Sequence, residues 1–183
     1  MLLVTKKFTA TKYQEMIETG ILTSDDHVEL IRGEIVAMSP IGRKHAACVR
    51  RLNDLLSEKL QKRALVDIQN PVELDDNSIP QPDVVLLKRR ADFYADSYPQ
   101  SSDVFLIIEV ADTTIKSDRN IKIPLYAEVN INEVWLVDTN NQSIEVYRQP
   151  VQGAYQQKQI FFIGDSISIL AFPDVTIAVN DIF

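Results

Sequence analysis

Two carboxylates and one amine stand in a short central stretch of the chain, at positions from which they could act together. Asp83 follows a proline at the head of a β-prone run, and Glu109 comes directly after five consecutive apolar residues, 26 positions later (109 − 83 = 26). A carboxylate at the end of an apolar strand is costly to bury unless it is paired or binds a metal. Lys122 falls on the helix expected next, with Asp118 one turn before it. This combination indicates a site for acid–base or metal chemistry.

The same residue types suit hydrolysis of a phosphodiester, which needs a water nucleophile and stabilisation of charge on the phosphoryl oxygens. Two carboxylates can hold one or two Mg²⁺ ions, with Mn²⁺ as a possible substitute, and Mg²⁺ keeps several waters and accepts phosphate oxygens. The metal lowers the pKa of a bound water and offsets negative charge. A nearby lysine can orient or deprotonate that water, or stabilise the charge of the transition state.

The elements around these residues are expected to bring them to one edge of a sheet. Residues 82–87 and 104–110 have the pattern of strands, and neighbouring strands lie roughly 5 Å apart. The second run is apolar almost throughout, which is typical of a strand covered on both faces. A helix within residues 118–129 and a strand at 133–138 would complete a βαβ unit with a right-handed connection.

The rest of the chain is expected to add helices and strands around this unit. In the helix after Glu109, we expect Ile121, Leu125 and Val129 to share one face and Asp118 or Asn120 to cap the start. The order of elements predicts an α/β fold, a mixed sheet flanked by helices, with an N-terminal helix and β-hairpin as an addition. The other expected elements are a helix over 11–18 capped by Thr9 or Thr11, a hairpin of 27–31 and 34–38, a helix over 44–63, strand-like runs at 65–68 and 71–74, and a meander of 143–148 and 159–162.

Length and charge limit the organisation and the partners. The 183 residues contain no repeat and no linker, so we expect one domain over 1–183. The formal net charge of −7 argues against a broad nucleic-acid-binding surface, because neutralising phosphates takes clustered Lys and Arg. Local basic patches remain, and for any one of them a solvated face is the simpler interpretation. They lie at 43–44, 50–51, 59–63 and 88–90.

Several features favour a cytoplasmic protein. The single cysteine, Cys48, cannot form an internal disulfide, which fits a reducing compartment. No apolar run approaches the roughly 20 residues of a membrane span. Residues 1–7 place two lysines after a very short apolar stretch, the reverse of the order in a secretory signal.

The chain resembles a known family, the Uma family of restriction-endonuclease-like proteins. The resemblance covers most of the chain, and its value lies in several motifs that occur in order, since each alone is weak. The motifs that carry it are Val28-Glu29-Leu30-Ile31-Arg32-Gly33-Glu34-Ile35, His45, Pro82-Asp83-Val84-Val85, Ile108-Glu109-Val110, the stretch 118–127, and Glu133-Val134-Trp135-Leu136-Val137-Asp138.

The resemblance implies a PD-(D/E)XK nuclease fold with Asp83 and Glu109 as metal ligands. In the parent nuclease pattern a lysine stands two residues after the second acid, but that position is Ala111 here. The Uma pattern has the lysine on the following helix, so the catalytic role is assigned to Lys122, with Lys116 as its rival.

Five further residues are candidates for supporting roles. Glu29 and Glu34 could simply face solvent, or one of them could approach the metal. His45 is more often a helix-surface or interface histidine, although the resemblance raises a substrate-side or metal-adjacent role. Gln81 could hydrogen-bond phosphate, and Asp118 stands near the proposed lysine.

The leading functional hypothesis is a Mg²⁺-dependent endonuclease that acts on DNA as a homodimer, because cutting both strands favours two-fold symmetry. A second hypothesis is a non-catalytic binding or regulatory module on the same fold. A third is a metal-dependent phosphodiesterase for a small nucleotide.

Overall fold

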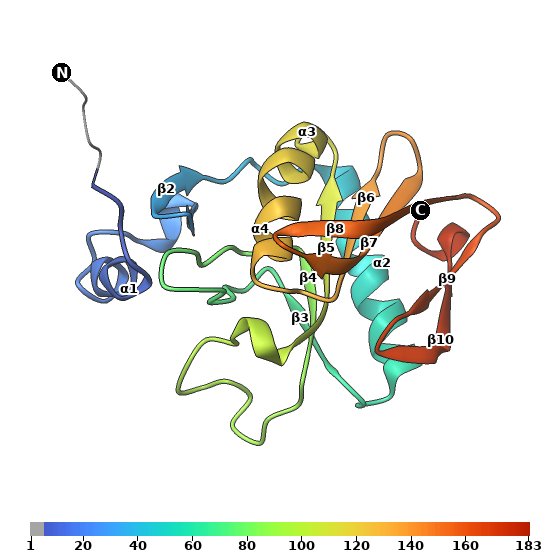
Figure 1. Cartoon of the computed structure of the whole chain (residues 1–183), viewed down its shortest axis with the longest axis horizontal. Helices are drawn as coiled ribbons and strands as arrows, with labels where there is room; N and C mark the ends of the chain where they lie inside the picture. Colours follow the sequence, from blue (N-terminus) through green and yellow to red (C-terminus); the bar gives the residue numbers. More distant parts are fainter. Residues whose placement is uncertain (1–5) are drawn as a thin grey trace.

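A six-stranded mixed sheet forms the centre of the molecule (Figure 1). The computed structural model describes residues 6–183. Residues 1–5, which belong to the segment compared above with a secretory signal, lie outside it. The strand order is β3-β4-β5-β6-β7-β8; β5 and β6 are parallel and the other neighbours antiparallel. The expected mixed α/β sheet is therefore confirmed. The strands are β3 (Leu65–Ile68), β4 (Val84–Leu87), β5 (Val104–Ala111), β6 (Glu133–Asp138), β7 (Ser143–Val151) and β8 (Ala154–Phe162).

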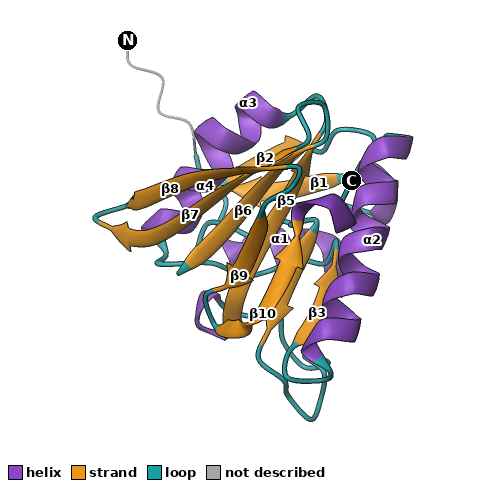
Figure 2. Ribbon diagram, turned by 90° about the vertical axis from the view of Figure 1, so that its right-hand side faces the viewer, coloured by secondary structure: helices purple, strands orange, loops and turns teal. Residues whose placement is uncertain are grey.

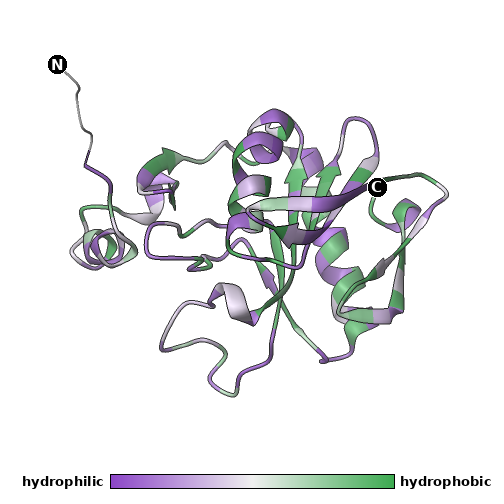
Figure 3. Cartoon of the chain, viewed as in Figure 1, coloured by the Kyte–Doolittle hydropathy of each residue, from purple (hydrophilic) through white to green (hydrophobic). Residues whose placement is uncertain are grey.

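Two layers cover this sheet (Figure 2). On one face, helix α2 (Arg43–Leu60) and the hairpin of β9 (Ser166–Ile169) and β10 (Phe172–Ala178) pack on Val84, Leu86, Ile108 and Trp135. On the other face, helix α4 (Ile123–Glu128) packs on Val85, Ile107 and Leu136. The central strands are the most apolar part of the ribbon (Figure 3), as expected for strands buried on both faces.

One expectation about strands was wrong, and one hairpin was not predicted. Residues 71–74 form no strand, although Val72 and Leu74 are buried. Their backbone N–H groups bond to the carbonyls of Pro80 and Ser78, but Pro80 has no N–H to return a bond and the N–H of Ile79 bonds to Leu30, so no continuous ladder forms. The β9–β10 hairpin was not foreseen.

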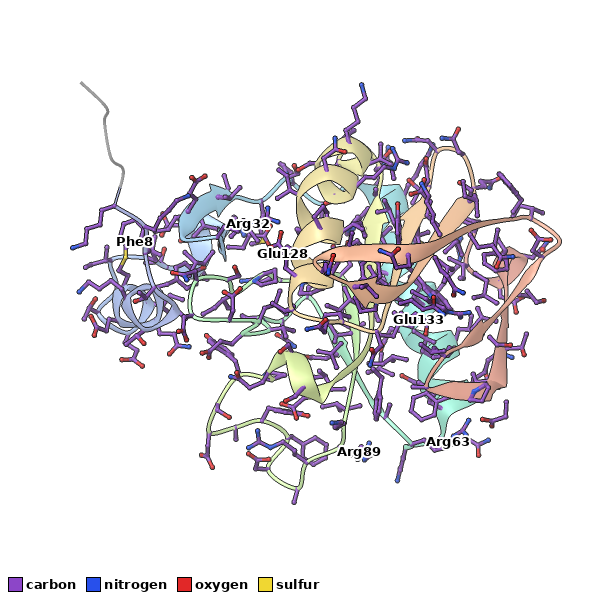
Figure 4. All side chains as sticks on the ribbon, in the orientation of Figure 1. Phe8, Arg32, Arg63, Arg89, Glu128 and Glu133 are labelled. Carbon is purple, nitrogen blue, oxygen red and sulfur yellow. The ribbon has the colours of Figure 1, made fainter. Side chains whose placement is uncertain are left out.

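The N-terminal addition matches the expected helix and hairpin. Helix α1 (Ala10–Glu18) begins after Thr9, whose hydroxyl oxygen accepts the N–H of Lys12 at 3.2 Å. Strands β1 (Val28–Ile31) and β2 (Glu34–Ala37) are joined by Arg32 and Gly33, both with positive φ, the backbone of a tight hairpin turn. The guanidinium of Arg32 pairs with Glu128 on α4 at 2.7 Å, which ties the hairpin to the main body (Figure 4).

The helical segment after β5 differs from the expected regular helix. It starts at α3 (Ile115–Ser117), widens into a π-helical turn over Asp118–Lys122, and continues as α4. The N–H of Ile123 bonds to the carbonyl of Asp118, five residues back. Asp118 and Asn120 are thus interior residues and do not cap the helix. Pro124, at the start of α4, has no N–H for a regular ladder, which helps to explain the wider turn.

The π-helical turn also changes which side chains are buried. Ile121, expected on the buried face, is 43 % exposed, whereas Leu125 is buried as expected and Val129 is half-buried. An extra residue in the turn rotates the preceding residues relative to α4, so the regular spacing fails across it. Three short 3₁₀ turns complete the fold, at Ser24–Asp26, Ser101–Asp103 and Val179–Asp181.

In the part of the chain that the structure describes, no helix has both the length and the apolar character needed to cross a membrane.

Candidate metal and catalytic site

Asp83 and Glu109 face each other on neighbouring strands. In the antiparallel pair of β4 and β5, Val84 lies opposite Ile108. Continuing that register by one residue places Asp83 opposite Glu109, and opposite residues project from the same face. The backbone N–H of Val110 donates to Oδ2 of Asp83 at 2.8 Å, which fixes the first carboxylate against the strand of the second. The two acids that the sequence singles out are therefore brought together.

Lys122 reaches this pair from the π-helical turn. Its Nζ lies 3.3 Å from Oε1 of Glu109 and 3.3 Å from Oε1 of Glu29. The side chain of Lys122 is 15 % exposed, so the ammonium sits largely out of solvent. Asp118, one turn earlier, is buried too. Lys116, the rival for the catalytic role, is exposed and forms no ion pair among residues 6–183.

Of the two N-terminal acids, only Glu29 approaches the site. It is buried on β1, its Oε1 contacts Lys122, and its Oε2 accepts the backbone N–H of Gln81 at 3.0 Å. Glu34 is exposed and pairs with Lys7 at the surface. Gln81 thus contributes through its backbone, which ties the hairpin to the segment that leads to Asp83.

His45 lies against Asp83, closer to the acids than a surface histidine would be. It stands in the first turn of α2, and its Nε2 is 2.9 Å from Oδ1 of Asp83. Gln69, which the sequence did not single out, donates its side-chain N–H to the same oxygen at 3.2 Å. The hydrogen bond to Asp83 raises the pKa of His45, and burial opposes this rise. Nδ1 of His45 is buried without a hydrogen-bond partner, alone in this respect among the described side chains.

Tyr126 is a further site residue that sequence reasoning missed. It is completely buried on α4, and its hydroxyl donates to Oε1 of Glu109. Burial is the main cause that raises the pKa of Glu109, and the ammonium of Lys122 opposes that rise. Burial also raises the pKa of Tyr126 well above its ordinary value, so the phenol stays a donor. In the sequence Tyr126 stands four residues after Lys122, on the same side of a helix, but that spacing alone does not distinguish it from a core tyrosine.

Comparisons with known proteins agree on the family and the fold. The Uma2 family model, described as "putative restriction endonuclease", matches residues 10–180. The chain belongs to the Uma2 family. A crystal structure of a "putative nuclease belonging to DUF820" from Anabaena variabilis superposes with a TM-score of 0.76 at 18 % identity, covering 96 % of this chain and 97 % of the other. At this identity the superposition shows a shared fold. A search of curated proteins found no match.

The donor set of this Uma2 protein fits a hard divalent cation. Within residues 6–183 there is no cluster of three or more His, Cys, Asp or Glu side chains arranged to hold a metal ion. The site instead offers two facing carboxylates, those of Asp83 and Glu109. That number suits Mg²⁺, which is usually bound by one or two carboxylates and keeps water or substrate phosphate oxygens in its other positions.

Proposed function

We propose that this Uma2 protein is a Mg²⁺-dependent endonuclease that hydrolyses phosphodiester bonds of DNA. The observation that carries the proposal is the convergence of Asp83, Glu109 and Lys122 from two strands and a helix onto one point. Asp83 and Glu109 would hold the metal, and Mn²⁺ would be able to replace Mg²⁺. When bound, the metal supplies an acidified water and a positive charge beside the phosphoryl oxygens.

Lys122 acts in this proposal as a charged hydrogen-bond donor that keeps its proton. Burial alone lowers the pKa of a lysine, but the carboxylates of Glu109 and Glu29 outweigh it and raise the pKa of Lys122 above its ordinary value. The amine therefore remains an ammonium at neutral pH. Such a group orients the attacking water and stabilises negative charge on the phosphoryl oxygens, and it does not abstract a proton.

The remaining side chains position these three. His45, Gln69 and the N–H of Val110 together occupy both oxygens of Asp83, which fixes the orientation of its carboxylate. The hydroxyl of Tyr126 donates to Oε1 of Glu109 and thereby fixes the orientation of that carboxylate. Hydrogen bonds of this kind hold metal ligands in place, and their loss typically lowers metal affinity or activity about 10–100-fold.

The test is metal binding followed by nicking of supercoiled DNA. Mg²⁺ and Mn²⁺ are titrated calorimetrically into the wild type and into the Asp83→Asn/Glu109→Gln variant, and each protein is then assayed with each metal. We expect binding and nicking by the wild type and neither by the variant. Glu18→Gln/Asp54→Asn is the matched control, because it removes the same charge from two exposed acids on α1 and α2 and should behave as wild type.

Two outcomes would redirect the assignment. Metal binding without nicking would move the substrate away from duplex DNA, and hydrolysis of a small phosphodiester would then support the second candidate, a small-substrate phosphodiesterase. The formal net charge of −7 favours that candidate over DNA. Absence of metal binding by the wild type would leave a non-catalytic binding or regulatory module.

Cutting both strands of a duplex would be served best by a homodimer with two-fold symmetry. Light scattering of the purified protein, with and without DNA, measures whether two copies associate. A strictly monomeric protein that only nicks one strand would contradict this part of the proposal.

A further inference from the structure

Helix α2 carries a basic stripe, which we define as Arg43, Lys44, Arg50 and Arg51. All four side chains are exposed. Residues seven apart lie on the same side of a helix, so Arg43 is aligned with Arg50 and Lys44 with Arg51. No carboxylate of the described residues forms an ion pair with any of them, whereas nine other Lys or Arg side chains do so. In a chain of net charge −7, four uncompensated cations within nine residues call for an anionic partner.

A pocket of about 390 Å³ lies beside the stripe, between α2 and the turn from β6 to β7. Lys44 and Arg51 stand on its helical wall, and its other wall is polar except for Phe183. That wall is fixed to the end of β5: the hydroxyl of Thr139 donates to the carbonyl of Ala111, and the side chain of Asn140 donates to the carbonyl of Asp112 at 2.6 Å. The full lining is Lys44, Ala47, Cys48, Arg51, Thr139, Asn140, Gln142 and Phe183.

The pocket and the candidate catalytic site share the start of α2 and the end of β5. His45 contacts Asp83, while its neighbour Lys44 lines the pocket. Consecutive helix residues differ in direction by about 100°, so one turn of α2 serves both places. Likewise, β5 supplies Glu109 to the site and ends at Ala111, which anchors the pocket wall. In Figure 1 the start of α2 and the end of β5 lie at the same end of the sheet.

We propose that the basic stripe and its pocket bind backbone phosphates of the DNA strand next to the bond that is cleaved. The identification of DNA as the ligand rests on the proposed function; the anionic specificity rests on the stripe itself. Arginine and lysine bind phosphate through charge-assisted hydrogen bonds, and such contacts set position without reading sequence. The stripe thus supplies a local positive surface beside the site, which reconciles a DNA substrate with an acidic chain.

The other basic patches lie away from the candidate catalytic site, although Lys59 and Arg63 also line a pocket, and each of these patches has a member held in an ion pair. Arg63 pairs with Asp174, and Arg90 pairs with Asp92. The patch at 88–90 follows the end of β4 opposite to Asp83, so it lies at the far end of the sheet from the acids. Figure 4 shows Arg63 and Arg89 together at that end.

The test compares two double variants that remove equal charge. Lys44→Gln/Arg51→Gln changes the stripe, and Lys59→Gln/Lys62→Gln changes exposed lysines at the other end of α2, about 22 Å along the axis from Lys44 to Lys59 at 1.5 Å per residue. Binding of a fluorescent duplex is measured by anisotropy over a range of salt, in EDTA and again in Ca²⁺. Each phosphate contact contributes about 0.9 to the slope of log affinity against log salt.

We expect the stripe variant to bind at least 10-fold more weakly at low salt, with a slope smaller by about 2, and the control to match wild type. Equal weakening in both variants, or no DNA binding by the wild type, would overturn the inference. Thermal unfolding of each variant shows whether it folds, and single-residue Lys44→Gln and Arg51→Gln proteins replace the double variant if it does not.

These outcomes separate the two proposals. If the wild type nicks DNA and the stripe variant does so with the same kcat/KM, the inference is overturned and the proposed endonuclease activity stands. Stripe-dependent DNA binding by a protein that never nicks would overturn the endonuclease and support the inference.

Discussion

Glu145 on β7 holds Arg119 through two hydrogen bonds, from Nη2 to Oε1 at 2.7 Å and from Nε to Oε2 at 3.2 Å. Arg119 stands inside the π-helical turn, between Asp118 and Lys122. The fork of a guanidinium on a carboxylate fixes direction as well as distance. The sheet therefore sets the rotation of the turn that presents Lys122 to the acids.

Arg119→Lys should lower kcat about 10-fold with little change in KM, because a lysine keeps the charge but cannot form the two-point contact. Steady-state nicking assays separate the two constants. Arg32→Lys is the matched control. Arg32 forms a similar but exposed ion pair with Glu128 on α4, so this substitution should leave kcat unchanged. A kcat that does not distinguish the two variants would contradict a positioning role for Arg119.

Glu145→Gln should remove a pH-dependent contribution to stability. Burial raises the pKa of Glu145, but Arg119, Tyr147 and Lys158 outweigh it and bring the pKa to about 2. A carboxyl group with a lowered pKa in the folded state stabilises it above the unfolded value, near pH 4.5, and loses that contribution as pH falls toward 2. Urea unfolding should show wild type more stable by roughly 2 kcal/mol at pH 7, from hydrogen bonds to a charged group, with the difference shrinking below pH 4.5. A difference that is constant with pH would exclude the ion pair as its source.

Lys122→Met should lower the kcat of metal-dependent nicking by about 10²–10³, the range for loss of one donor that stabilises charge in the transition state. It should also lower the free energy of unfolding of the metal-free protein by about 3 kcal/mol, because Glu29 and Glu109 lose the charge between them. Lys116→Met changes an exposed lysine of the same helical segment and is the control for both measurements. Activity in Lys122→Met equal to that of the control would transfer the catalytic role to another residue.

Tyr126→Phe should weaken Mg²⁺ binding about 10-fold, because Glu109 loses the phenol that orients it. The free energy of unfolding should fall by about 1 kcal/mol from the lost hydrogen bond. Tyr155→Phe removes a similar bond, to the carbonyl of Ile131 at 2.7 Å on the same face of the sheet, and should lower stability alone. Calorimetric titration and urea unfolding of both variants provide the comparison, and equal metal affinities would show that Tyr126 is only structural.

The sequence predicts the elements of this protein best where one periodic pattern dominates. The apolar run of β5 and the apolar residues at helical spacing in α2 specify their structure locally, and both elements formed as expected. The π-helical turn could not be read in the same way, because regular spacing places Ile121 on the buried face. Its geometry depends on Pro124 within the chain and on Arg119 bonding to a strand that lies 26 residues further on.

For the site, the sequence supplied the residue types, and the sheet register supplied their juxtaposition. Glu109 could be nominated because a carboxylate after an apolar run is unusual, and Asp83 and Lys122 could be nominated because of their spacing from Glu109 and the resemblance to the Uma family. Gln69 and Tyr126 could not, because a glutamine after a strand and a tyrosine on a helix are ordinary until their partners are known. The ion pairs of Glu145 could not be predicted for a related reason. A glutamate in an alternating strand normally faces solvent, whereas here Arg119 and Lys158 cover it.

The ammonium of Lys122 meets Glu109 from a helix, while position 111, where an adjacent lysine would stand, holds a buried alanine. The acids and the amine can consequently lie far apart in the sequence and still be close in the folded protein. A pattern search that demands a lysine two positions after the second acid would overlook this chain. A three-dimensional template of two carboxylates and one ammonium, which ignores the order of residues in the chain, would find it. The same template would find any homologue whose lysine stands at another position in the sequence.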